Sequence, residues 1–228
     1  MLHTLLFDLY DTLIWLEVER SNEGRRKLAS RLGVPAERFL AVWNRSVEQR
    51  MLGQGGRLAD HLAAAAAALG VEPSPGLVAE LLSIERRRLE ESVHLYPSTV
   101  PTLRRLREAG YRLGMVSNVS DGAAIPIFHL GIDRLFDTLV LSHEVGILKP
   151  DPAIFDLACR RLGAAPAETV FVADGGFGEL DAAHQMGIFG VLLEQEGQSQ
   201  DYGFSTRYDA KIHDLAELEH LLPALPEP

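Results

Sequence analysis

Near the start of the chain stands the sequence Leu2-His3-Thr4-Leu5-Leu6-Phe7-Asp8-Leu9-Tyr10-Asp11-Thr12-Leu13. Its first half is a short apolar run, typical of a strand that is buried on both faces. Asp8 and Asp11 follow this run, with Thr12 beside them. Two carboxylates at the end of a buried strand are unfavourable unless a cation lies near them. Because ligands of open α/β sheets bind at the carboxyl ends of the strands, we expect a metal ion or another positively charged partner here.

Beyond residue 96 the pattern alternates between helix and strand. Such alternation predicts an α/β fold with a doubly wound parallel sheet. The expected strands after the first are Arg112–Val116, Thr138–Leu141, Thr169–Ala173, Ile188–Leu193 and a short Ala210–His213. Asp151 and Pro152 suit the N-cap and first position of a helix that runs to Leu162. The segment 215–222 is expected to form a terminal helix, and the Pro-rich residues 223–228 a frayed tail.

The residues between the first strand and this alternating part have a different character. Positions 16–91 are rich in Arg, Glu, Leu and Ala, with breaks at residues 33–35, 53–56 and 70–76. The pattern predicts three or four helices with no strand between them. We therefore expect an α/β core made of residues 1–15 and 93–228 and an inserted α-helical cap made of residues 16–92. A helical subdomain that does not contact the site is the alternative.

Composition limits the class of protein. The chain has 228 residues, 46% of them hydrophobic, and a formal net charge of −10 from 22 basic and 32 acidic residues. This charge argues against nucleic acid or an anionic membrane as a partner but permits a small anionic substrate. The single cysteine, Cys159, excludes an internal disulfide and fits a core position. Without a membrane-length apolar run or a signal-type N-terminus, we expect a cytoplasmic protein of undetermined oligomeric state.

Four strand ends carry polar residues, and in a parallel sheet these ends lie on one edge. In chain order the residues are Asp8 and Asp11, Ser117 and Asn118, Lys149, and Asp174 with Glu179. Together they offer a carboxylate nucleophile, a hydroxyl donor, a cation and a pair of metal-binding carboxylates. This combination is suited to the handling of a phosphate-like group.

The same residues carry a resemblance to the haloacid dehalogenase-like (HAD) hydrolases. Asp8–Thr12 resembles the first motif of that family, Val116–Asn118 the second, Lys149 the third and Val172–Leu180 the fourth. The resemblance implies a Rossmann-like core with a helical cap after the first motif. It also implies a nucleophilic Asp8 and an Mg²⁺ cofactor held by Asp8, the backbone carbonyl of Tyr10, Asp174 and Glu179. Thr12, Ser117, Asn118 and Lys149 would bind the substrate. Asp181 is the alternative to Glu179 as the second acidic ligand.

Tyr10 departs from the family pattern. Phosphatases of this family carry an Asp there as the acid that protonates the leaving oxygen, whereas a phenol is a poorer donor at neutral pH. The first interpretation is a phosphohydrolase of small phosphorylated metabolites that uses Asp11, Tyr10 or a cap residue as the acid, or that prefers activated phosphates. The second is a 2-haloacid dehalogenase, whose family carries Tyr at this position. The third is a non-enzymatic phosphate- or metabolite-binding protein on the same scaffold.

Overall fold

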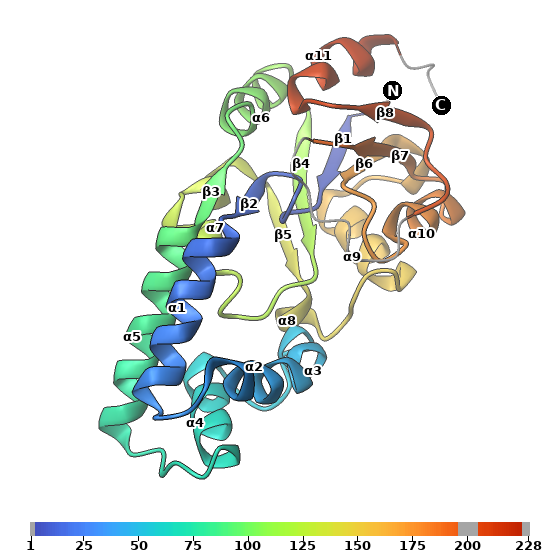
Figure 1. Ribbon diagram of the computed structural model, residues 1–228. Coiled ribbons are helices and arrows are strands. Elements are labelled where there is room, and N and C mark those ends of the chain that lie inside the picture. Colours follow the sequence, from blue (N-terminus) through green and yellow to red (C-terminus); the bar gives the residue numbers. More distant parts are fainter. Residues whose placement is uncertain (1–2, 196–204, 225–228) are drawn as a thin grey trace.

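The computed structural model describes residues 3–195 and 205–224 of the chain. Its centre is a parallel six-stranded sheet in the order β5-β4-β1-β6-β7-β8 (Figure 1). The strands are β1 (Thr4–Phe7), β4 (Arg112–Ser117), β5 (Thr138–Leu141), β6 (Thr169–Ala173), β7 (Phe189–Leu193) and β8 (Ala210–Ile212). This confirms the predicted doubly wound α/β fold, with β5 and β6 at the expected residues.

Helices cover both faces of the sheet, which explains why its central strands are mostly apolar. Leu5 and Phe7 of β1 belong to one hydrophobic cluster and Leu6 to another, because alternate side chains of a strand point to opposite faces. One face packs against α6 (Thr99–Glu108), α7 (Ile125–His129) and α11 (Leu218–Leu221). The other packs against α9 (Pro152–Leu162) and α10 (Glu179–Gln185).

A local sequence signal explains where α9 begins. Asp151 caps α9, because its side chain accepts a hydrogen bond from the backbone N–H of Ala153 at 2.9 Å. The short α8 (Ser142–Val145) follows β5 directly. The expected terminal helix is broken into the 3₁₀ turn Leu215–Glu217, α11 and the 3₁₀ turn Leu222–Ala224. The predicted tail at 223–228 lies outside the described residues from position 225 onward.

The residues predicted as the cap form five helices. They are α1 (Val18–Arg31), α2 (Ala36–Arg45), α3 (Val47–Met51), α4 (Leu58–Ala68) and α5 (Pro75–Ser92). One more helix than expected arises because the backbone turns at Ser46, which ends α2 and precedes α3. Figure 1 shows α1 and α5 as the long helices of this part, with α2, α3 and α4 at their far end. Leu28, Phe39, Leu62 and Leu81 are buried in a hydrophobic cluster of their own.

A two-stranded antiparallel ribbon joins the cap to the sheet. It consists of β2 (Ile14–Leu16) and β3 (Val93–Leu95), with Trp15 opposite His94. The ribbon was not predicted, because strands of three residues are too short to show a period of two. It places the entry and the exit of the cap side by side, directly after the polar residues that follow β1. None of the described helices combines the length and the apolar character that crossing a membrane requires.

Candidate active site

The polar residues after β1 lie at the carboxyl edge of the sheet, between the two neighbouring strands. Asp8 continues the line of β1, and its backbone N–H donates to the carbonyl oxygen of Val172 in β6 at 3.0 Å. The side chain of Asp8 is buried and accepts a hydrogen bond from the Nζ of Lys149. Residues that are 141 positions apart in the chain thus meet at one point.

Three carboxylates converge there. Oxygen atoms of Asp8, Asp174 and Glu179 lie within 4.8 Å of one another. Lys149 Nζ also contacts Glu179 Oε2 at 2.5 Å. The other carboxylate oxygen of Glu179, Oε1, is enclosed and has no hydrogen-bond partner among the described residues. Three carboxylates facing one ammonium group leave an excess of buried negative charge.

The excess charge shows in the acid–base properties of the cluster. Burial, reinforced by Asp8, raises the pKa of Asp174 above its usual value. Burial also raises the pKa of Glu179 well above the usual value, although Lys149 acts in the opposite direction. For Lys149, burial alone would lower the pKa, but the charges of Asp8 and Glu179 outweigh burial and raise it. Oxygen donors with unbalanced charge and an unpartnered oxygen fit a hard divalent cation such as Mg²⁺.

Neighbouring residues hold this cluster in place. The backbone N–H of Asp174 donates to the Oγ1 of Thr12 at 3.1 Å, which ties the end of β6 to the loop after β1. Asn118 binds the backbone of Lys149 twice: its Nδ2 donates to the Lys149 carbonyl at 2.8 Å, and its Oδ1 accepts from the Lys149 N–H at 2.7 Å. Ser117 is buried at the end of β4. Both polar atoms of the Asn118 side-chain amide therefore orient the loop that carries Lys149.

The two candidates for the second acidic ligand lie in different surroundings. Glu179 is the first residue of α10 and reaches the cluster. Asp181 turns away, because its carboxylate accepts hydrogen bonds from the backbone N–H of Thr206 at 2.9 Å and from its hydroxyl at 3.0 Å. Sequence spacing alone left both open. The two acids differ because residues 205 and 206 lie against the start of α10, where Thr206 binds Asp181 and leaves Glu179 to face the cluster.

Tyr10 and Asp11 also differ in their hydrogen bonding and in their pKa values. The hydroxyl of Tyr10 donates to the carbonyl oxygen of Ala123 at 3.0 Å, and burial raises the pKa of Tyr10 above its usual value. Asp11 adopts a left-handed backbone conformation, with φ of 58°. Burial, followed by the charges of Asp174 and Asp8, raises the pKa of the Asp11 carboxyl to about 6. Near neutral pH Asp11 thus has the better acid–base properties for proton transfer.

Two residues near the site were missed by sequence reasoning. Burial, followed by the charges of Asp11 and Asp174, raises the pKa of Tyr96. Gln195 donates through Nε2 to the carbonyl oxygen of Thr12 at 3.2 Å. A Tyr-Pro pair after a helix marks only a turn, and a Gln after a strand carries no specific signal. Both come close to the site only because β3 and β7 end beside it.

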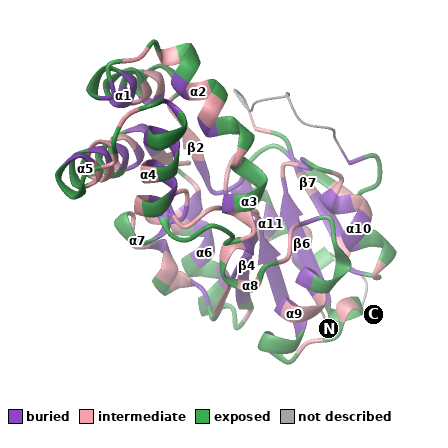
Figure 2. Ribbon diagram, turned by 90° about the horizontal axis from the view of Figure 1, so that it is seen from below, coloured by how far each residue is buried: buried purple, intermediate pink, exposed green. Residues whose placement is uncertain are grey.

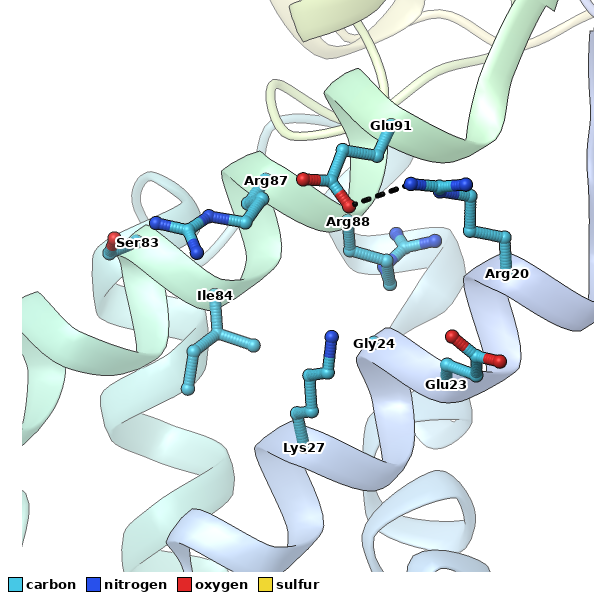
Figure 3. Close-up of a pocket in the computed structure, with 9 residues that line it drawn as sticks. All are labelled: Arg20, Glu23, Gly24, Lys27, Ser83, Ile84, Arg87, Arg88 and Glu91. Atoms are coloured by element: carbon cyan, nitrogen blue, oxygen red, sulfur yellow. Dashed lines mark hydrogen bonds and ion pairs between the residues drawn. The ribbon is translucent and has the colours of Figure 1, made fainter.

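A cavity of about 270 Å³ lies between α1 and α5, away from the acidic cluster. Figure 3 shows the residues that line it, among them Arg20, Lys27, Arg88 and Glu91. Arg20 pairs with Glu91 at 3.4 Å, and Arg88 pairs with Glu85. Lys27 also lines this cavity. The cavity contains none of the residues predicted for catalysis.

Comparison with known proteins now identifies the family. A family model described as haloacid dehalogenase-like hydrolase matches residues 2–187. The chain belongs to the haloacid dehalogenase-like hydrolases. This confirms the resemblance carried by the four motifs, and the protein is a hydrolase by family.

Individual relatives of this hydrolase include enzymes of two kinds. A glyceraldehyde 3-phosphate phosphatase of Methanopyrus kandleri is 30% identical over 222 residues, which cover 94% of this chain and 92% of the relative. An (S)-2-haloacid dehalogenase of a Pseudomonas species is 28% identical, with 95% of each chain covered. A solved 2-haloacid dehalogenase structure from Pseudomonas syringae pv. Tomato superposes with a TM-score of 0.74 at 26% identity, covering 98% of this chain and 99% of the other.

The buried position of Lys149 leads to a prediction about stability. Replacing Lys149 by Met keeps most of the side chain but leaves the buried carboxylates of Asp8 and Glu179, and the partly buried one of Asp174, without their cation. We expect the free energy of unfolding to fall by about 3–5 kcal/mol, the usual effect of removing one partner of a buried ion pair. Urea denaturation followed by circular dichroism measures the change.

The matched control is Lys211→Met, because Lys211 pairs with Glu194 at 2.6 Å on the surface. Surface ion pairs contribute little to stability, so this variant should unfold close to the wild type. Equal effects of the two substitutions would contradict the view that Lys149 neutralises a buried acidic cluster.

Proposed function

We propose that this hydrolase is an Mg²⁺-dependent phosphatase that acts on a small phosphorylated metabolite through a phosphorylated Asp8. The observation that carries the proposal is the cluster of Asp8, Asp174 and Glu179 around Lys149. A full-length relative described as a glyceraldehyde 3-phosphate phosphatase supports the same reaction class.

In the first step a carboxylate oxygen of Asp8 attacks the phosphorus atom. The bond between phosphorus and the leaving oxygen breaks, and that oxygen leaves as the alcohol after it receives a proton. In the second step water attacks the phosphorus of the aspartyl-phosphate and restores the Asp8 carboxylate with release of phosphate. Lys149 and Ser117 bind the oxygens of the transferred group, and Thr12 and Asn118 position Asp174 and Lys149.

Asp8, Asp174, Glu179 and the backbone carbonyl of Tyr10 would hold Mg²⁺. Bound there, the ion lowers the repulsion between the anionic nucleophile and the anionic substrate. The unpartnered Oε1 of Glu179 and the excess negative charge support this assignment.

We assign the transfer of a proton to the leaving oxygen to Asp11 and not to Tyr10. The Tyr10 hydroxyl already donates to Ala123, whereas the Asp11 carboxyl has a pKa raised to about 6 by burial and by neighbouring carboxylates. A group with a pKa close to the working pH is the more effective general acid.

The second candidate function is hydrolysis of 2-haloacids. Tyr10 and the similarity to the solved 2-haloacid dehalogenase favour it. Halide leaves without protonation, so the loss of an acid at position 10 would not matter. However, those dehalogenases need no metal and lack the acidic fourth motif, whereas this chain keeps Asp174 and Glu179 facing Asp8. We therefore rank it second.

A substrate panel separates the candidate functions. Acetyl phosphate, an aryl phosphate, a sugar phosphate and a 2-haloacid are assayed with Mg²⁺ and with EDTA. We expect phosphate release that depends on Mg²⁺ and disappears in Asp8→Asn. Halide release that persists in EDTA would establish the dehalogenase instead. A folded protein that is inactive on the whole panel would favour the binding protein.

The role of Asp11 predicts a dependence on the leaving group. Asp11→Asn keeps the left-handed backbone that Asn tolerates, but removes the acid. We expect the kcat for an alkyl phosphate to fall about 10²–10⁴-fold, while acetyl phosphate, with its good leaving group, is affected far less. Tyr10→Phe serves as the comparison and should affect both substrates alike. An equal loss on both substrates in Asp11→Asn would remove Asp11 from this role.

The assignment of Glu179 predicts a change in metal affinity. In Glu179→Gln the Mg²⁺ concentration for half-maximal activity should rise at least about 10-fold, while in Asp181→Asn it should stay near the wild-type value. The Mg²⁺-dependent rise of the melting temperature provides a readout without turnover. If Asp181→Asn weakens Mg²⁺ binding and Glu179→Gln does not, the assignment of the second ligand is wrong.

A further inference from the structure

Arg50 of α3 is a buried cation in the cap. Only 6% of the residue is exposed. Its Nη1 donates to the carbonyl oxygen of Trp43 and to the Oγ of Ser46, both at 2.6 Å, and its guanidinium lies 4.0 Å from the centre of the Trp43 ring. These contacts fix the plane of the guanidinium but do not neutralise it.

Within the described part of the chain, no carboxylate lies within ion-pair distance of Arg50. Burial lowers its pKa to about 10, against the partial effects of Glu85 and Asp121. Glu85 is engaged by Arg88, which donates to both of its carboxylate oxygens at 2.7 Å. Asp121 accepts a hydrogen bond from the backbone N–H of Leu58 at 2.7 Å. A buried cation without a counter-ion is unfavourable, so an anion from outside the described protein would be stabilised here.

The segment that carries Arg50 packs against the elements that follow the strands at the carboxyl edge of the sheet. Gly53 closes this segment with φ of +69°, and a Cβ there would overlap the carbonyl oxygen of His143 in α8. The Leu58–Asp121 bond attaches the start of α4 to the loop after β4, four residues beyond Ser117. Figure 2 shows α3 in front of the sheet and close to α8. Arg50 thus belongs to the stretch that bridges the loops after β4 and β5.

One edge of the guanidinium makes no hydrogen bond within the described residues. Nη1 makes both hydrogen bonds, which leaves the side edge formed by Nε and Nη2. Neither nitrogen makes a hydrogen bond within the described residues, and neither is fully enclosed. Two parallel N–H groups on this edge match two oxygens of a carboxylate or a phosphate.

We propose that the side edge of Arg50 binds a second anionic group of the substrate, a carboxylate or a second phosphate, so that the enzyme selects small phosphorylated acids or bisphosphates. This inference rests on the proposed phosphatase function and adds the substrate class. Arg50 is then a specificity-determining residue that makes no contact with the reacting phosphorus. The Trp43 stack and the Ser46 hydrogen bond hold it in the orientation that it needs.

The test compares three substrates on one carbon skeleton: glycerol 3-phosphate, 3-phosphoglycerate and glycerol 1,3-bisphosphate. In the wild type with Mg²⁺, we expect a higher kcat/KM for one or both of the last two than for glycerol 3-phosphate. Their ranking distinguishes a carboxylate from a phosphate as the second anion. Arg50→Met should reduce this selectivity ratio about 10- to 100-fold, mainly through KM, because a charge-assisted bidentate contact is lost.

Arg45→Met is the matched control, because Arg45 is an exposed arginine at the end of α2. It should leave the selectivity ratio unchanged. Arg50→Lys keeps the charge without the fork and should recover only part of the ratio. Circular dichroism checks that the variants are folded. If Arg50→Met does not fold, Arg50→Lys still tests the inference.

Calorimetric titration of the inactive Asp8→Asn protein with 3-phosphoglycerate and glycerol 1,3-bisphosphate measures binding without turnover. Two outcomes overturn the inference and leave the phosphatase function intact. In the first, the wild type turns over all three substrates without selectivity. In the second, folded Arg50 variants have the same selectivity ratio of kcat/KM values as the wild type. No turnover on any phosphate overturns the phosphatase function. In that case equal binding by Asp8→Asn with and without Arg50→Lys also overturns the inference, whereas weaker binding without the native Arg50 supports it.

Discussion

The contact of Lys149 with Asp8 and Glu179 is the interaction on which the structure at the carboxyl edge of the sheet depends. Each of the three charged groups is almost fully removed from solvent. None would be stable there alone, since the burial of an isolated charge is opposed by the loss of hydration. The loop after β1, the Lys149 loop and the start of α10 must therefore come together as a unit. Asn118 and Thr12 then hold the backbone of this unit from two sides.

The balance of charge within this unit is the basis of the proposed phosphoryl transfer. One ammonium group does not neutralise three carboxylates, and burial, reinforced by the neighbouring carboxylates, raises the pKa values of Asp174 and Glu179. Burial and the charges of Asp174 and Asp8 also raise the pKa of the Asp11 carboxyl to about 6. In the proposed function this single arrangement of charges would provide the nucleophile, a place for a divalent cation and an acid, while the Tyr10 hydroxyl donates to the carbonyl oxygen of Ala123.

The cap contributes a second set of buried charges that differs from the first in its balance. Arg88 and Glu85 neutralise each other between α1 and α5, and Ser21 accepts the remaining bond from Arg88. Arg50 is buried in the same cap without such a partner. The segment after α3 packs against α8 at Gly53, and the start of α4 is bound to Asp121 in the loop after β4. The substrate would therefore meet a cation from the core at one end and a cation from the cap at the other.

The sequence by itself determined the fold class, the strands of the sheet and the set of polar residues at their ends. It could do so because buried strands have continuous apolar runs, and because polar groups that interrupt such runs at the same sheet edge are rare unless they serve a site. It could not distinguish Glu179 from Asp181, find the β2–β3 ribbon or assign a role to Arg50. The choice between the two acids depends on Thr206, which returns from 25 residues away to bind Asp181. The significance of Arg50 depends on the absence of a carboxylate beside it in the described structure. Local sequence patterns record periodicity and composition, whereas the pairing of charges is set by which distant segments pack together, and only the tertiary structure decides that.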